Sequence, residues 1–279
     1  MDEEALEPIT FVALRYGLAF VALMVVVLGR STYRDQVRSL DRAAWRDIGL
    51  LGLVFYTVTQ GAQFIAIDNQ PAATSSLVLA LTPLLVAATA TRSLSEMPHR
   101  SQVTGAVLVA LGAWSYFSGD LGATVIGMTA AVVGLGGNTA STVLGRRLNK
   151  ETAMSPLVVT GLSMAIGSLS LVALGIGVEG VPEISAAAWS IIIWLAAVNT
   201  ALAFTLWNVS LRRLSAVESA GINNTMLIQI AMLAWIFLDE APSAGEWVGI
   251  AAVSLGIFLT QTALSGSGPG RERQVRARH

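Results

Sequence analysis

The sequence predicts an all-α protein, a polytopic bundle of membrane-spanning helices. Its 279 residues are 54% hydrophobic and only 13% charged, and the mean hydropathy is +0.65. A soluble domain of this length needs about twice that share of charged residues to cover its surface. Two further observations support the prediction: the charges are segregated between alternate loops, and the second half of the chain repeats the first.

Apolar runs long enough to cross a bilayer recur along the chain. An α-helix needs about 20 residues to cross the hydrocarbon core of about 30 Å. We expect nine spans, joined mostly by short connections that make consecutive helices antiparallel neighbours: 9–29, 47–67, 72–91, 101–118, 123–145, 156–178, 187–211, 217–238 and 246–264. Pro83 lies in the middle of its span, where it should kink the helix or free a carbonyl group.

The positive charges fix the orientation of these spans. Sixteen of the 17 Lys and Arg residues fall in alternate connections (30–46, 92–100, 146–151, 212–218) and in the basic tail 266–279, and the exception is Arg15 inside the first span. Cytoplasmic loops of membrane proteins carry such an excess of basic residues. We therefore expect a multi-pass protein of the inner (plasma) membrane with a cytoplasmic C-terminus.

Arginine recurs at every fourth position of the first basic segment, from Arg30 to Arg46, with Tyr33, Val37 and Leu40 between. This spacing predicts a short amphipathic helix on the inner surface, and we favour anionic lipid headgroups as its partner.

A shift of 144 residues aligns the two halves without a gap. It places Glu96 on Glu240, Gly105 on Gly249, Val109 on Val253 and Gly112 on Gly256. Because the loop at Glu96 is expected inside and the loop at Glu240 outside, the two copies run in opposite directions through the membrane. Inverted repeats are typical of secondary transporters, although some channels share them. We assign 1–118 to the first copy and 119–265 to the second.

The chain resembles the EamA branch of the drug/metabolite transporter superfamily. The resemblance covers nearly all of it and rests on PITFVALRYGLAF (8–20), PAATSSLVLALTPLL (71–85) and NTALAFTLWN with INNTMLIQIAMLAWIFLDEAPS (199–208, 222–243). Members of this family consist of two inverted halves of five helices, which implies a transporter with a central cavity. The second copy here has five expected spans and the first has four, so we expect its first helix, the counterpart of 123–145, to precede residue 1.

Two polar and aromatic stripes lie at corresponding positions of the copies. On an α-helix, at about 100° per residue, each set shares one face. The first stripe is Tyr56, Gln60, Gln63 and Phe64, and the second stripe is Thr200, Phe204, Trp207 and Asn208. Aromatic rings with amide groups suit amphipathic organic substrates, so we expect both stripes to face a common cavity. The alternative is that the amides join neighbouring helices by hydrogen bonds.

Other polar residues fall on neighbouring spans. In 217–238 we assign Asn224, Thr225 and Gln229 to the cavity, whereas Glu218 suits either a helix cap or a proton carrier. Asn138 belongs to a face of small residues that favours close helix packing, and we add it to the cavity. For Arg15 we favour snorkelling to the surface, or pairing with Asp68 or a helix C-terminus, over substrate binding.

The residues that catalysis or cofactor chemistry requires do not form a recognisable set. There is no Cys, only two His, and no nucleophile–His–acid combination, metal-ligand cluster or phosphate loop. We predict neither an enzyme nor a cofactor or metal protein, and we expect no nucleic-acid partner. The sequence specifies no oligomeric state.

The sequence favours a secondary transporter that exports small amphipathic metabolites such as amino acids through a central cavity by alternating access. Its partners are then a small-molecule substrate and the lipid bilayer. The export direction and the substrate class come from the family resemblance. Facilitated diffusion and proton antiport both stay open, because no acidic residue lies deep in a predicted span. The alternative from another class is a non-transporting membrane scaffold or sensor subunit.

The orientation can be tested directly because the chain has no native cysteine. An impermeant maleimide applied to intact cells should label a cysteine introduced at Gly180 and leave one at Tyr33 unlabelled. Permeabilised cells should show labelling at both positions. The reverse pattern in intact cells contradicts the predicted topology.

Overall fold

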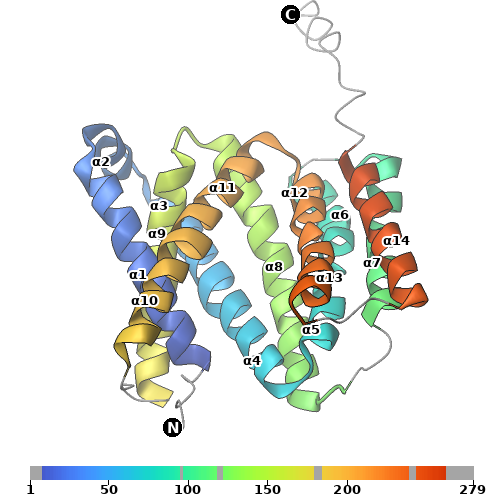
Figure 1. Cartoon of the computed structure of the whole chain (residues 1–279). Coiled ribbons are helices and arrows are strands. Elements are labelled where there is room, and N and C mark those ends of the chain that lie inside the picture. The colour runs from blue at the N-terminus through green and yellow to red at the C-terminus, as the bar shows by residue number, and fades with distance from the viewer. Residues whose placement is uncertain (1–7, 95–96, 118–121, 179–183, 239–242, 262–279) are drawn as a thin grey trace, which may run out of the picture. The chain divides into compact units, whose positions relative to one another are not determined.

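The computed structural model describes residues 8–94, 97–117, 122–178, 184–238 and 243–261, and every regular element within them is a helix (Figure 1). The predicted all-α class is confirmed for this part of the chain. Six of its helical stretches are long and apolar enough to cross a membrane: Ile9–Gly29, Arg42–Asn69, Thr74–Thr91, Pro156–Gly175, Ala186–Arg213 and Ala244–Gln261.

The predicted spans 101–118, 123–145 and 217–238 are helical over their described residues but are not among those six. The first two contain more glycine and polar residues, and the third is interrupted at Asn224. The count of nine spans therefore stays a prediction.

The chain folds into two compact units, each of which takes segments from both predicted copies. The first unit is Met1–Leu79 with Gly122–Ser215, and the second is Ala80–Leu121 with Ala216–His279. The first contains α1 (Pro8–Gly29), α2 (Ser31–Arg38), α3 (Arg42–Gly52), η1 (Leu53–Gln60), α4 (Gly61–Asn69), α5 (Ala72–Leu79), α8 (Val125–Glu151), α9 (Pro156–Val178), α10 (Ala186–Trp194), η2 (Leu195–Leu202) and α11 (Ala203–Arg213). The segments η1 and η2 are π-helical turns inside longer helices.

The core of the first unit forms where α1, α3, η1 and α9 pack together. Tyr16, Ile48, Tyr56, Met164 and Leu171 are among its largest buried side chains. Helices α1 and α9 lie side by side, and η1 and α4 pack along α8 (Figure 1). This packing brings segments of both copies against one another within one unit.

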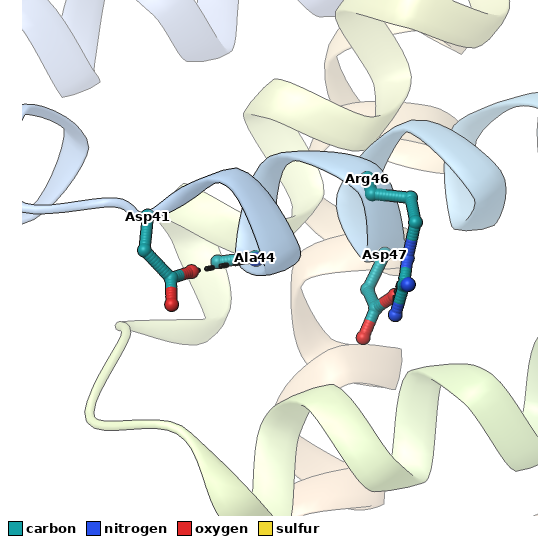
Figure 2. Close-up of polar contacts among 4 residues, drawn as sticks. All are labelled: Asp41, Ala44, Arg46 and Asp47. Carbon is teal, nitrogen blue, oxygen red and sulfur yellow. Dashed lines mark hydrogen bonds and ion pairs between the residues drawn. The ribbon is translucent and has the colours of Figure 1, made fainter.

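The basic segment 30–46 folds as two helices rather than one. Helix α2 confirms the predicted amphipathic helix over Ser31–Arg38, and Arg34 Nη1 donates to the Leu28 carbonyl at 2.7 Å, which caps the end of α1. Asp41 then starts α3, because its Oδ1 accepts from the Ala44 N–H at 2.8 Å, and Arg46 pairs with Asp47 at 2.8 Å on the same helix (Figure 2). A capped start explains why α3 begins before the predicted boundary at residue 47.

Helix α8 continues to Glu151, six residues beyond the predicted end of its span. Arg146 Nη1 donates to the carbonyls of Leu211 and Arg212, at 2.8 and 3.1 Å. The basic side chain thereby caps the last turn of α11, where helix carbonyls lack partners. The expected loop at 146–151 is helical because its polar residues find these partners.

The second unit contains α6 (Thr82–Ser93), α7 (Arg100–Phe117), α12 (Ala216–Asn223), α13 (Thr225–Leu238) and α14 (Ala244–Gln261). Helices α7 and α14 lie side by side along their lengths (Figure 1). Their contact uses glycine because the backbones nearly touch. A Cβ atom added to Gly105 would lie 2.5 Å from the Gly256 carbonyl oxygen, and one added to Gly112 would lie 2.7 Å from that of Gly249.

These glycine contacts have the symmetry of an inverted repeat. Under the 144-residue shift, Gly105 corresponds to Gly249 and Gly112 to Gly256, so the two contacts are copies of each other. Val109 and its counterpart Val253 lie between them, and both are buried. The pseudo-twofold axis of this helix pair therefore passes near the two valines.

We predict that Gly249→Ala destabilises the protein by about 1–3 kcal/mol through overpacking. The added methyl would lie 2.7 Å from the Gly112 oxygen and 2.9 Å from the Tyr116 nitrogen. Gly245→Ala on the same helix is the matched control, because no atom lies within 4 Å of its added Cβ. Alanine there should leave the stability unchanged or raise it by up to about 1 kcal/mol.

The midpoint of thermal unfolding in detergent, followed by tryptophan fluorescence, measures both variants. Equal midpoints for Gly249→Ala and Gly245→Ala contradict the close α7–α14 contact.

Candidate functional site

Both candidate stripes lie on helices interrupted by π-helical segments. In η1, Thr59 Oγ1 donates to the Val54 carbonyl at 2.7 Å, and in η2, Thr200 Oγ1 donates to the Leu195 carbonyl at 3.0 Å. Each hydroxyl thus bonds the carbonyl five residues before it. Segments of this kind inside α-helices are rare and are frequent at functional sites.

The wider π-helical turn rotates the side chains away from the α-helical register on which the stripes were predicted. In the first stripe Tyr56 is fully buried, whereas Gln60, Gln63 and Phe64 are half-buried. Gln63 lies against α8, where an added Cβ at Gly134 would be 3.3 Å from its Cγ. The first stripe therefore does not present one uniform face.

The second stripe is divided in the same way. Thr200 and Asn208 are buried, and Phe204 and Trp207 pack at the edge of the core. The ring centroids of Phe204 and Tyr56 are 5.4 Å apart, so the two stripes meet at these residues.

Asn208 joins three helices. Its Nδ2 donates to Thr160 Oγ1 at 3.0 Å and to the Phe204 carbonyl at 3.1 Å, and its Oδ1 accepts from Asn149 Nδ2 at 2.6 Å. This geometry corresponds to the alternative role considered for the amides, hydrogen bonding between neighbouring helices. A contact of Asn208 with substrate stays a prediction.

Asn138 is half-buried on α8, and its carbonyl accepts from Ser141 Oγ at 3.0 Å and Thr142 Oγ1 at 2.7 Å. Gly145 on the same face lies close to Leu211 of α11. The small residues of this face therefore pack against neighbouring helices, as predicted for the face as a whole.

Arg15 has a different partner from those expected. Its Nε donates to Thr200 Oγ1 at 2.9 Å, and its guanidinium carbon lies 5.4 Å from the centroid of the Tyr16 ring. Asp68 is not its partner, because Arg15 reaches across to η2. Sequence reasoning thus missed Arg15 and Tyr16 as neighbours of the second stripe, although a single basic residue inside a span was the available signal.

In the second unit, Asn224 is buried, Thr225 is half-buried at the start of α13, and Gln229 is exposed. Glu218 lies in the first turn of α12, where its Oε1 accepts from Gln102 Nε2 at 3.1 Å. Asn224 bonds the backbone: its Nδ2 donates to the Ala80 carbonyl at 3.2 Å.

This bond joins two helix breaks at corresponding positions of the copies. The predicted span 72–91 is interrupted between α5 and α6 at Ala80 and Leu81, and 217–238 is interrupted between α12 and α13 at Asn224. Ala80 and Asn224 are 144 residues apart, so they are counterparts in the repeat.

Pro83 accounts for the first break. Proline has no N–H, and its ring crowds the carbonyl four residues before it. The next amide, Leu84 N–H, donates to Leu81 at 3.1 Å, and the Ala80 carbonyl is left to accept from Asn224. The kink predicted at Pro83 is therefore a complete interruption.

A cavity of about 600 Å³ opens on the first unit between η1, α4, α8 and α9. Its wall is apolar and includes Val58, Ile65, Ile126, Val133 and Leu174. None of the twelve predicted residues lines it. Within the described residues, no three His, Cys, Asp or Glu side chains come together as metal ligands.

The sequence profile of the EamA-like transporter family matches the chain twice, over residues 3–118 and 125–262. The chain belongs to the EamA-like transporter family. It is thus a polytopic membrane protein of a family of transporters rather than enzymes, with one EamA repeat in each half. No curated protein matches the sequence significantly.

A solved structure shares the fold of this chain. A crystal structure described only as that of a protein shares 20% sequence identity with this chain and superposes on it with a TM-score of 0.75. The aligned region covers 93% of this chain and 89% of the chain in that structure. At this identity the likeness concerns the fold alone.

We predict that Asn208→Ala lowers the free energy of unfolding by about 1–3 kcal/mol, because the Asn149 amide loses its buried partner. Asn223→Ala, at an exposed position, is the control and should leave it unchanged. Thermal unfolding in detergent measures both. A loss of substrate affinity with unchanged stability would instead assign Asn208 to the substrate.

Proposed function

We propose that this EamA protein is a secondary transporter that exports small amphipathic metabolites, such as amino acids, through a central cavity by alternating access. It acts in the inner (plasma) membrane with its C-terminus in the cytoplasm. The twelve predicted residues, which lie on the two stripes, on α8, at the break before α13 and on α13, contact the substrate along its path in this proposal.

The observation that carries the proposal is the pair of helix breaks joined by Asn224 and Ala80. Interrupted helices at corresponding positions of inverted repeats are the best pointer to a transporter's binding site, because they provide backbone groups and a place to bend. Backbone polar groups at membrane depth require hydrogen-bond partners, so an interrupted helix there costs free energy unless its free groups are paired. The family match supports transport, and the two meeting stripes supply the aromatic and amide groups that amphipathic substrates need.

The repeat also supports a further helix packed on η2 and α11. Helix α8 covers Thr59 and Ala62 in the first copy, and both are buried. Their counterparts under the 144-residue shift, Ala203 and Leu206, are exposed, and Leu206 exposes 58% of its surface. We propose that an apolar helix equivalent to α8 covers this face in the active protein. Transport is therefore to be tested with the complete gene product, including any apolar segment encoded before residue 1.

We predict that Asn224→Ala slows export from proteoliposomes while the protein still folds. The substitution leaves the Ala80 carbonyl without its partner at the break, which costs about 1–3 kcal/mol in whichever conformation makes the bond. Trp207→Ala and Gln60→Ala should weaken substrate affinity by roughly 5- to 150-fold, as expected for a lost contact of about 1–3 kcal/mol.

Counterflow of labelled amino acids measures these rates. Asn223→Ala is the control, because its side chain is exposed next to Asn224. Wild-type rates for Trp207→Ala and Gln60→Ala overturn the stripes as the site. The absence of flux for every substrate with the complete protein favours a scaffold or sensor subunit.

A further inference from the structure

Arg15 carries a charge that the described part of the protein does not neutralise. It lies in α1, within the candidate membrane span Ile9–Gly29. Its Nε donates to Thr200 Oγ1 at 2.9 Å, and no carboxylate of the described residues forms an ion pair with it. Charged side chains inside a span are costly unless they pair, so such a group marks a site for an anionic partner.

Two buried hydroxyl groups lie next to it. Tyr16 and Tyr56 are fully buried, and neither phenol oxygen has a hydrogen-bond partner within the described residues. Their ring centroids are 5.6 Å apart, and the Tyr16 ring lies beneath the Arg15 guanidinium. Buried polar groups in native proteins are almost always paired, so two adjacent exceptions call for a ligand or bound water.

The same place has an aromatic wall. Phe204 contacts Tyr16, Tyr56 and Phe55, with ring centroids 5.6, 5.4 and 5.2 Å away. Edge-on and tilted ring contacts of this kind suit a further ring or an apolar body. Tyr56 belongs to η1 and Thr200 to η2, so both π-helical segments of the first unit contribute to the cluster.

We propose that Arg15, Tyr16, Tyr56 and Thr200 form a binding site for the carboxylate of the transported substrate, whose apolar body packs on Phe55 and Phe204. The proposal rests on the transport function proposed above and narrows the substrate to organic acids with an apolar, preferably aromatic, body. The terminal nitrogens of Arg15 donate to the two carboxylate oxygens, which is the paired geometry that guanidinium groups favour. The phenol groups donate to the same oxygens.

The site is closed in this conformation because Tyr16 and Tyr56 are fully buried. The substrate enters when η1 and η2 move apart. In each segment a threonine hydroxyl donates to the carbonyl five residues before it. This π-helical arrangement is local, and each segment can return to an α-helical turn.

The test compares two probes of the same shape, phenylacetate and its neutral amide phenylacetamide, with acetate as a small anion. Binding to the purified full-length protein in detergent is followed by tryptophan fluorescence. The wild type should bind phenylacetate at least about tenfold more tightly than phenylacetamide, the size of one charged hydrogen bond. Acetate should bind weakly; equal affinity for acetate and phenylacetate would identify a site for small anions and overturn the substrate class.

The variants separate a ligand-binding role from a structural one. Arg15→Gln should remove the preference for phenylacetate. Arg15→Lys should retain part of that preference, because lysine keeps the positive charge but lacks the paired donors of arginine. Tyr16→Phe and Tyr56→Phe should each weaken phenylacetate about fivefold without lowering the unfolding midpoint, because the hydroxyls they remove have no protein partner. Arg213→Gln, at the exposed end of α11, is the control.

The proposal is wrong if the wild type does not prefer phenylacetate, or if Arg15→Gln keeps the wild-type preference with an unchanged unfolding midpoint. Counterflow in proteoliposomes tests the transport function separately. Preferential binding without flux refutes transport and leaves the carboxylate site intact. Flux of both probes at equal rates leaves transport intact and refutes the site.

Discussion

The hydrogen bond from Asn224 to the Ala80 carbonyl satisfies the strictest constraint on this protein, that backbone polar groups at membrane depth must be paired. Pro83 breaks the helix, the Leu84 N–H donates to Leu81 instead of Ala80, and the Asn224 side chain that donates to the Ala80 carbonyl stands at the counterpart position of the other copy. The free carbonyl at the break in one copy is therefore paired by a side chain at the corresponding break in the other copy.

The same symmetry determines how α7 and α14 associate. Lipid is as apolar as leucine, so helices in a membrane gain most from close van der Waals contact, which glycine permits. The Gly105–Gly256 and Gly112–Gly249 contacts use the same two positions of the repeat twice. Gly105 contacts Gly256, which is the counterpart of Gly112, and Gly112 contacts Gly249, which is the counterpart of Gly105. One pair of glycines in an inverted repeat thus produces an extended helix pair.

Polar side chains in the first unit fall into two groups with different consequences. Asn208 bonds both Asn149 and Thr160, and Arg146 caps α11, so these groups hold helices together. Arg15 has no carboxylate partner among the described residues, and Tyr16 and Tyr56 have phenol groups that the described protein leaves unused. In an interior where unpaired donors are costly, the second group is where a ligand contributes most to the stability of the folded state.

The sequence by itself determined the helical class, the inverted repeat and the interruption at Pro83. Each follows from local or periodic chemistry: apolar length, recurring residues at one shift, and the missing N–H of proline. It also placed Tyr56 and Phe204 on corresponding stripes, and these rings do meet. Only the tertiary structure decided the rest. The π-helical turns η1 and η2 rotate the stripes out of the α-helical register, and each contains a threonine hydroxyl that donates to the carbonyl five residues earlier, which no periodicity reveals. The partners of Asn208 and Arg15 lie 59 and 185 residues away in sequence, and proximity of that kind arises only when the helices pack.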